Sequence, residues 1–362
     1  MSDILWSDRL VKAYKETDYR LMGHGIVTTD LLIKSMKAIG QGKAVDVYGR
    51  GEIITDFQEK IAKELGTEDA VFYPSGTMAQ QIALRMWCDK GDVKSVAYHP
   101  KCHLEIHEED GLKELHGIKT ILLGEENRLF TLEDLKAVDE PLGAVLIELP
   151  QREIGGQLPS FEELREISKY CHKNNIPLHL DGARLFECLP YYRKKASEIC
   201  ELFDSVYISF YKGIGGVTGA MLASSKEFCK ESKVWKRRYG GDLYALYPYI
   251  IPADYCYEMR KDKFGLYYDG AVKIAELFNQ CNHIRTLPEV PVSNMFHVHI
   301  DLAKEKVEEI FCKVYEVSNV GIRPNVYGDH KSCYFEFNIG DVYLNTPMEN
   351  IQEAFSSLKD LI

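Results

Sequence analysis

The sequence predicts an α/β fold, a mostly parallel sheet of seven strands sandwiched by helices, followed by a smaller α+β domain. Two observations predict the sheet: short runs rich in Val, Ile, Leu and Tyr recur between residues 69 and 224, and helix-like segments lie between many of them. Alternation of this kind is typical of parallel sheets covered by helices. A third observation predicts the second domain, because the pattern changes after about residue 250.

Seven apolar runs are the expected strands, and each is short enough to cross a sheet once. In chain order they are "DAVFYP" (69–74), "SVAYH" (95–99), "IKTILLG" (118–124), "GAVLIELP" (143–150), "IPLHLDG" (176–182), "SVYISF" (205–210) and "GAMLAS" (219–224). Two of the segments between them, 77–90 and 160–175, are predicted helices. The second opens with Ser160 before two Glu residues, which is a typical helix start.

Three domains are expected from this pattern. Residues 1–48 lack strong strands and are expected to form a helical arm that packs against the small domain or a partner subunit. Residues 49–250 form the large domain. Residues 251–362 form the small domain, in which 292–301 and 333–339 are strand-like and a helix is expected near 303–316.

Composition limits the function classes. The 362 residues include 44 basic and 55 acidic side chains, which gives a formal net charge of -11. This charge argues against general binding to nucleic acid and against an acidic membrane surface as a partner. A small-molecule substrate is therefore expected.

The cysteines and the hydropathy pattern predict a cytoplasmic protein. The ten Cys are scattered without a C-x-x-C pair or a compact disulfide spacing, so we expect reduced core residues. No apolar run approaches the roughly 20 residues needed to cross a bilayer. Charges throughout "MSDILWSDRLVKAY" also argue against a membrane segment there.

Three motifs fall where strands end, and ligands of open α/β sheets bind beyond the carboxyl ends of the strands. "YPSGTMA" places Gly76 and Thr77 at a strand-to-helix link, where free N–H groups favour a phosphate. In "HLDGAR", Asp181 ends an apolar strand, and Lys212 follows the strand at 205–210. Each alone has an ordinary structural interpretation: a helix N-cap, a turn Asp, and a paired or solvent-reaching Lys.

Together these three motifs suit one ligand. It would have a phosphate, an aldehyde that captures an amine, and a ring nitrogen that needs an acid partner. Pyridoxal 5'-phosphate (PLP) has all three. A Schiff base would remove the cost of an isolated buried ammonium at Lys212, and the Asp181 carboxylate would keep the pyridine nitrogen protonated.

Six stretches of the sequence make the suggestion of PLP more specific. In these stretches the chain resembles fold-type I PLP enzymes of the threonine aldolase and β-eliminating lyase family. They keep the family's order over most of residues 20–250. The stretches are "VDVYGRG" (45–51), "FYPSGTMAQ" (72–80), "HLEIHEEDG" (103–111), "GGQLP" (155–159), "HLDGARLFE" (179–187) and "YKGIGGVTG" (211–219).

The resemblance implies a role for each matching residue. Lys212 would attach the cofactor, Asp181 would hold its pyridinium, and His103 would stack on the ring and help with proton transfer. Gly76 and Thr77 would bind the phosphate. The residues implied for the substrate are Arg184, which would contact both the cofactor and the substrate carboxylate, and Tyr48, which would reach a neighbouring subunit's site. The resemblance also implies a homodimer or homotetramer with shared active sites.

The chain departs from the aldolase pattern in several places. Tyr211 replaces the hydroxyl residue that usually precedes the Lys, and Glu153 stands where aldolases carry a second active-site His. "CYFEFNIGD" lacks the family's Arg for the substrate carboxylate, for which Arg323 or Arg152 could substitute. Near the N-terminus, "MGHG" brings His24 in place of "R-S-D-T".

The predicted function is retro-aldol cleavage of a threonine-like β-hydroxy-α-amino acid to glycine and an aldehyde. Alternatives are a β-eliminating amino acid lyase and a protein that binds PLP without turnover. A remote alternative is a metal-dependent hydrolase, drawn from His99, Cys102, His103, His107 and Glu108 in "YHPKCHLEIHEED". The natural amino acid and its stereochemistry at Cβ stay open.

Overall fold

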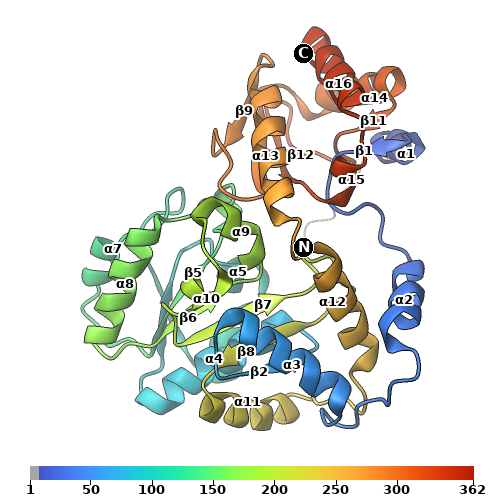
Figure 1. Cartoon of the computed structure of the whole chain (residues 1–362). Helices are drawn as coiled ribbons and strands as arrows, with labels where there is room; N and C mark the ends of the chain where they lie inside the picture. Colours follow the sequence, from blue (N-terminus) through green and yellow to red (C-terminus); the bar gives the residue numbers. More distant parts are fainter. Residues whose placement is uncertain (1–7) are drawn as a thin grey trace. The chain divides into compact units, whose positions relative to one another are not determined.

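The computed structural model describes residues 8–362 (Figure 1). The chain divides into two compact units. The larger comprises Thr28–Ile154 and Leu158–Asp262, and the smaller comprises residues 8–27, Gly155–Gln157 and Lys263–Ile362. The expected domain boundaries after residues 48 and 250 stay predictions. The predicted arm is shared by the two units, and residues 1–7 of it lie outside the described residues.

A seven-stranded sheet forms the centre of the larger unit, in the order β2-β8-β7-β6-β5-β3-β4. Only β8 runs antiparallel to its neighbours, β2 and β7. All seven expected runs are confirmed as strands of this sheet. Their bounds are β2 Asp69–Tyr73, β3 Ser95–Tyr98, β4 Lys119–Leu122, β5 Ala144–Glu148, β6 Leu178–Asp181, β7 Ser205–Ser209 and β8 Ala220–Ser224.

Helices follow most of the strands, as the alternating pattern predicts. In the larger unit they are α2 Thr29–Ser35, α3 Glu52–Leu65, α4 Gly76–Gly91, α5 His103–His107, α6 Gly111–His116, α7 Leu132–Lys136, α8 Phe161–Lys173, α9 Leu185–Tyr192, α10 Ala196–Cys200, α11 Lys226–Arg238 and α12 Tyr247–Arg260. A π-helical turn, Met36–Gly40, and a 3₁₀ turn, Arg152–Ile154, complete the set.

Apolar side chains alternate between the two faces of the sheet and bury both. On one face, α4 and α11 pack over the strands, where the Trp87 and Phe228 rings stack at 4.5 Å. On the other, Phe57 of α3 packs against Phe210 with ring centroids 4.9 Å apart. The helix layers on both faces confirm the predicted sandwich.

The predicted start of α8 offers a test of local stability. Ser160 Oγ accepts a hydrogen bond from the Glu163 N–H at 3.1 Å. We expect Ser160→Ala to lower the free energy of unfolding by about 0.5–2 kcal/mol, because that N–H loses its partner. Urea denaturation would measure the change. Ser160→Asp keeps a capping oxygen and should retain most of the stability, so an equal loss in both variants would contradict this explanation.

The smaller unit is built on a four-stranded antiparallel sheet in the order β12-β13-β10-β9. Phe278 lies at the centre of its core, with the Phe355 ring at 4.8 Å and the Phe337 ring at 5.6 Å. This confirms the predicted α+β architecture. The elements are α1 Asp8–Glu16, β1 Tyr19–Arg20, α13 Phe264–Asn279, β9 Ile284–Leu287, β10 Met295–Ile300, α14 Lys304–Ser318, β11 Val320–Gly321, β12 Tyr327–Gly328, β13 Cys333–Asn338, α15 Asp341–Leu344 and α16 Met348–Leu361.

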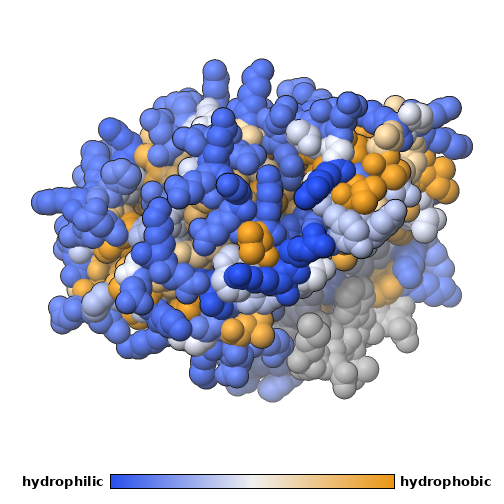
Figure 2. All heavy atoms as spheres, turned by 90° about the horizontal axis from the view of Figure 1, so that it is seen from below, coloured by the Kyte–Doolittle hydropathy of each residue, from blue (hydrophilic) through white to orange (hydrophobic). Residues whose placement is uncertain are grey.

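The ten Cys are all buried with free thiols, as the scattered spacing predicts. No helix between residues 8 and 362 has the length and apolar character that a membrane crossing requires. The face drawn in Figure 2 is mostly hydrophilic, with hydrophobic groups at several places between the polar side chains.

Candidate active site

The candidate site lies at the carboxyl ends of the parallel strands in the larger unit. In the sheet register, Glu148 at the end of β5 lies beside Asp181 at the end of β6, and Asp181 lies beside Tyr207 of β7. The chain then turns after β7 into the loop that carries Lys212. Parallel pairing therefore gathers Glu148, Asp181 and Tyr207, which lie far apart in the sequence.

Asp181 is a buried carboxylate, 2% exposed. It accepts hydrogen bonds from Gln80 Nε2 of α4 at 2.8 Å and from the Ala183 N–H at 3.1 Å. Burial raises the pKa of Asp181, and the neighbouring His103 opposes that effect. A buried carboxylate of this kind is costly unless a cationic or hydrogen-bonding ligand meets it.

The loop with Lys212 is held by backbone hydrogen bonds. The Gly213 N–H donates to Glu187 Oε1 of α9 at 2.9 Å, and the Gly216 N–H donates to the Phe210 carbonyl at 2.6 Å. The Lys212 ammonium lies 5.2 Å from the Tyr211 ring centroid. Lys212 is therefore carried on an ordered turn rather than on a loose surface loop.

Arg184 lies beside the same loop. Its guanidinium is 3.1 Å from Glu187 Oε2, and the two side chains are 10% and 1% exposed. Glu187 thus links Arg184 and the backbone next to Lys212. Arg184 is brought to the predicted site, with Glu187 already balancing part of its charge.

Helix α4 begins at Gly76 without a side-chain cap from Ser75. The Ser75 side chain therefore does not satisfy the first N–H groups of this 16-residue helix, and such groups favour an anion. A Cβ at position 76 would overlap the Tyr207 ring, so glycine is needed for the close approach. Thr77 is the next residue of the same turn.

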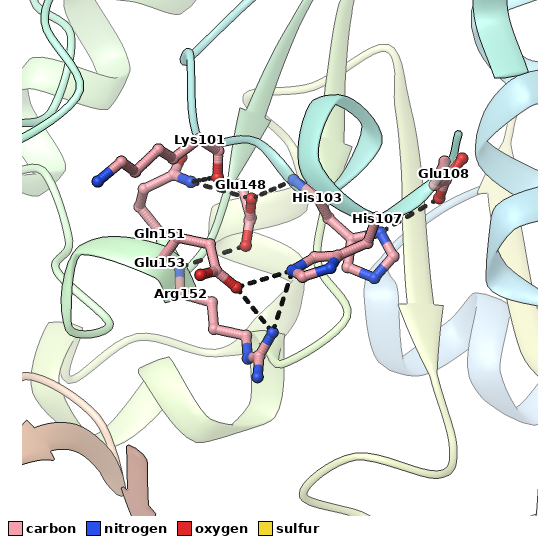
Figure 3. A network of polar contacts seen from close by, with 8 residues as sticks. All are labelled: Lys101, His103, His107, Glu108, Glu148, Gln151, Arg152 and Glu153. Atoms are coloured by element: carbon pink, nitrogen blue, oxygen red, sulfur yellow. Dashed lines mark hydrogen bonds and ion pairs between the residues drawn. The ribbon is translucent and has the colours of Figure 1, made fainter. Parts of the chain in front are cut away.

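His103 opens α5 at the edge of this cluster (Figure 3). Its backbone N–H donates to Glu148 Oε2 at 3.1 Å, and its Nδ1 lies 3.2 Å from Glu108 Oε1. The hydrogen bond with Glu108 raises the pKa of His103, while burial lowers it. Asp181 also raises the pKa, which places His103 in the same electrostatic cluster.

Glu148 is a site residue that sequence reasoning missed. Its carboxylate accepts from the N–H groups of His103 and Arg152 and from Gln151 Nε2, at 3.1, 3.2 and 3.1 Å. Burial, followed by the charge of Asp181, raises the pKa of Glu148. An acidic residue ending an apolar strand, "LIELP", was the available signal, and it is the same signal that marked Asp181.

Glu153 lies in a second polar group beside His103 (Figure 3). Its Oε1 is 2.8 Å from His107 Nε2 and 2.8 Å from an Arg152 nitrogen. The His103 and His107 rings are 5.1 Å apart. Glu153 and Arg152 therefore pair with each other, and their substrate roles stay predictions.

The residues of the metal alternative do not form one ligand set. His99 Nε2 is bonded to the Arg128 carbonyl at 2.8 Å, whereas His103 and His107 each face a different carboxylate. Within residues 8–362, no three His, Cys, Asp or Glu side chains are grouped as a metal site would need.

Tyr48 lies elsewhere on the larger unit. It is 46% exposed and has a positive φ of 47°. Its ring contacts Tyr244 at 5.4 Å, and the Arg237 guanidinium lies 5.3 Å from its centroid. Tyr48 and Arg237 line a cavity of 590 Å³, together with Arg50 and Lys236. An exposed Tyr in a basic surface remains compatible with its predicted role across an interface.

Arg323 belongs to the smaller unit and is not a solvated surface side chain. Its Nε donates to the Asn325 carbonyl at 3.3 Å, and its guanidinium contacts Met22 Sδ. Burial lowers its pKa. The contact connects Arg323 with the "MGHG" stretch, and its role at a substrate carboxylate stays a prediction.

Comparisons with known proteins identify the family of the chain. Residues 27–301 match the family model described as β-eliminating lyase. A solved structure of a candidate L-allo-threonine aldolase from Listeria monocytogenes EGD-E is 51% identical, with 98% of this chain and 99% of that chain covered and a TM-score of 0.95. A candidate aromatic amino acid β-eliminating lyase/threonine aldolase from Exiguobacterium sp. 255-15 is 50% identical, with coverage of 98% and 100% and a TM-score of 0.96.

A curated relative is more distant. The low-specificity L-threonine aldolase 1 of Arabidopsis thaliana is 26% identical over 268 residues, which cover 71% of this chain and 74% of that protein. The family model alone covers most of the chain, and the fold agrees throughout with that of the two solved structures. The chain therefore belongs to the threonine aldolase and β-eliminating lyase family of fold-type I enzymes, as its six sequence stretches indicated.

Proposed function

We propose that this protein is a PLP-dependent lyase that cleaves a threonine-like β-hydroxy-α-amino acid into glycine and an aldehyde. One observation carries the proposal: the buried Asp181 carboxylate ends β6 in the same cluster as the uncapped start of α4 and the turn that carries Lys212. The aldolase descriptions of the relatives support the reaction type.

The residues present fit PLP. The uncapped N–H groups at Gly76 and Thr77 suit a phosphate, and the buried Asp181 suits a protonated ring nitrogen. Gln80 donates to Asp181, yet its Oε1 is buried and has no partner among residues 8–362. Gln80 Oε1 thus belongs to an amide that is hydrogen-bonded to Asp181, and a buried polar atom without a partner is typical of a site that a ligand completes.

The proposed roles follow from these positions. Lys212 would supply the amine that attaches the cofactor, and Asp181 would keep the ring nitrogen protonated. When bound, PLP accepts the electron pair that is released when the Cα–Cβ bond breaks. His103 would stack on the ring and take the proton of the β-hydroxyl group, and such a positioned base contributes about 10²- to 10⁴-fold. Arg184 would meet the substrate carboxylate.

A product analysis tests the proposed reaction. The full-length protein, loaded with PLP, would be given threonine, allo-threonine and phenylserine, and glycine and aldehyde would be measured. Release of both in equal amounts supports the proposal. Formation of a ketoacid and ammonia would instead indicate β-elimination, and cofactor absorption without any product would indicate binding without turnover. Either outcome would overturn the proposal.

We further propose that the protein works in the cytoplasm as a homodimer or homotetramer with active sites completed across the interface. The reduced, buried cysteines are consistent with a reducing compartment. Tyr48 and its basic surroundings would face the neighbouring subunit, and Glu153 and Arg323 remain candidates for substrate contacts. Light scattering in solution gives the subunit number, and a monomer that retains full activity would contradict the shared site.

A further inference from the structure

We propose that Glu108 is a positioning residue that keeps a proton on Nδ1 of His103, so that Nε2 is the nitrogen available to exchange a proton with the substrate. The inference rests on the proposed function, in which His103 acts on the β-hydroxyl group. In that step the O–H bond breaks, the proton goes to Nε2, and the O–H electron pair forms the second C–O bond of the aldehyde. The electron pair of the Cα–Cβ bond leaves with the glycine carbon.

The contact between Glu108 and His103 fixes the proton's place. His103 Nδ1 lies 3.2 Å from Glu108 Oε1, and an ionised carboxylate only accepts hydrogen bonds. Nδ1 must therefore be the donor. The Glu108 side chain is 2% exposed, whereas that of His103 is 30% exposed. The buried Glu108 therefore holds the Nδ1 side of the imidazole, while part of the His103 side chain stays accessible.

Glu108 is itself held in place from a second element. Its Oε2 accepts from Gln81 Nε2 of α4 at 3.1 Å, and Gln81 is 6% exposed. A Cβ at Gly111 would overlap the Gln81 amide, so the glycine leaves the space that this amide occupies. The first two turns of α4 thus hold both carboxylates, because Gln80 donates to Asp181 and Gln81 donates to Glu108.

The neighbouring histidine shows that this arrangement is specific to His103. His107 lies one helical turn further along α5, and Glu153 approaches its Nε2 rather than its Nδ1. Glu153 is also shared with Arg152, and its side chain is 27% exposed. The two adjacent imidazoles are therefore held through different ring nitrogens (Figure 3). The carboxylate that faces His103 is also bonded to Gln81 of α4.

The charges around His103 act in the same direction. Glu108, Asp181 and Glu148 all face the ring and raise its pKa, Glu108 most, while burial opposes them. The His107 ring is a further titratable neighbour, with its centroid 5.1 Å from that of His103. A raised pKa means that His103 gains its proton at higher pH than an isolated imidazole. Removing the Glu108 charge should therefore move this titration to lower pH.

The test is an NMR titration of the His103 ring in the full-length protein, with PLP and in parallel without it. We expect Glu108→Gln to lower the proton affinity of His103 by about tenfold, which is one pH unit. Glu108→Ala should also let the neutral ring populate both tautomers, visible in the ring nitrogen shifts. Glu109→Gln is the matched control: it removes the same charge from an exposed neighbour and should leave the titration unchanged.

Kinetics of the loaded enzyme gives a second readout. We expect the acidic limb of the kcat/KM profile to move to lower pH in Glu108→Gln, with kcat lowered about tenfold and KM changed less than twofold. An unchanged His103 titration in both Glu108 variants would overturn the inference even if the wild-type enzyme cleaves threonine. Failure of the wild-type enzyme to cleave any hydroxy-amino acid would overturn the proposed function instead, whatever the titration shows.

Discussion

Lys212→Ala is expected to abolish covalent attachment of PLP and to lower the cleavage rate by roughly 10³- to 10⁶-fold, the range seen when a catalytic nucleophile is removed. The Gly213 and Gly216 N–H groups hold the turn that carries Lys212 by hydrogen bonds to Glu187 and the Phe210 carbonyl. The measurements are the absorption spectrum of the loaded protein and the rate of aldehyde release.

Two control variants separate attachment from charge. Lys212→Arg keeps the positive charge but has no primary amine, so it should lose the absorption band as fully as Lys212→Ala. Lys230→Ala removes a Lys from the exposed face of α11 and should leave both spectrum and rate unchanged. A Lys212→Ala protein that keeps the band and most of its rate would show that the cofactor is attached elsewhere or not at all.

The fold could be predicted because its information is local. Each strand of the central sheet is a short run rich in apolar residues, and all of these strands except the edge strand β4 are largely buried. Gly76, Asp181 and Lys212 could be found for the same reason, since each lies at or shortly after the end of such a run and strand ends in parallel sheets meet at one edge.

The partners of these residues could not be predicted, because they come from distant segments. Gln80 and Asp181 are 101 residues apart, and His107 and Glu153 are 46 apart. No periodicity links such positions. His103 and His107 are four residues apart in α5, yet this spacing could not show that each faces its own carboxylate.

Arg323 illustrates the limit for single charged residues. In the sequence it stands in "GIRPN", a stretch that is typical of an exposed turn. In the structure, hydrogen bonds between the Tyr315 hydroxyl and the Arg323 backbone hold this turn against α14, at 2.6 and 2.9 Å. Burial of an Arg depends on which helix covers it, and local sequence does not contain that information.

Asp181→Asn is expected to lower the cleavage rate about 10²- to 10⁴-fold. Removing one partner of a buried ion pair costs about 3–5 kcal/mol, and each 1.36 kcal/mol in the barrier is a factor of ten. The Asn side chain has the shape of Asp, and its oxygen can still accept the hydrogen bond from Gln80 Nε2. The loss of rate therefore reports the missing negative charge. The measurements are kcat with threonine and the affinity for PLP, with the exposed Asp262→Asn as a matched control.

The same variant should be more stable than the wild type when PLP is absent. Burial raises the pKa of Asp181 in the folded chain, so between about pH 4 and that raised pKa the folded state binds more protons than the unfolded state. Stability then falls as pH rises through this window, by about 1.4 kcal/mol for each unit of the shift. Asp181→Asn has no carboxylate to ionise and avoids this loss. Urea unfolding at several pH values should show that the free energies of unfolding of the two proteins diverge toward neutral pH. If the cofactor-free variant is instead less stable than the wild type at pH 7, the Asp181 charge serves the fold rather than the ligand.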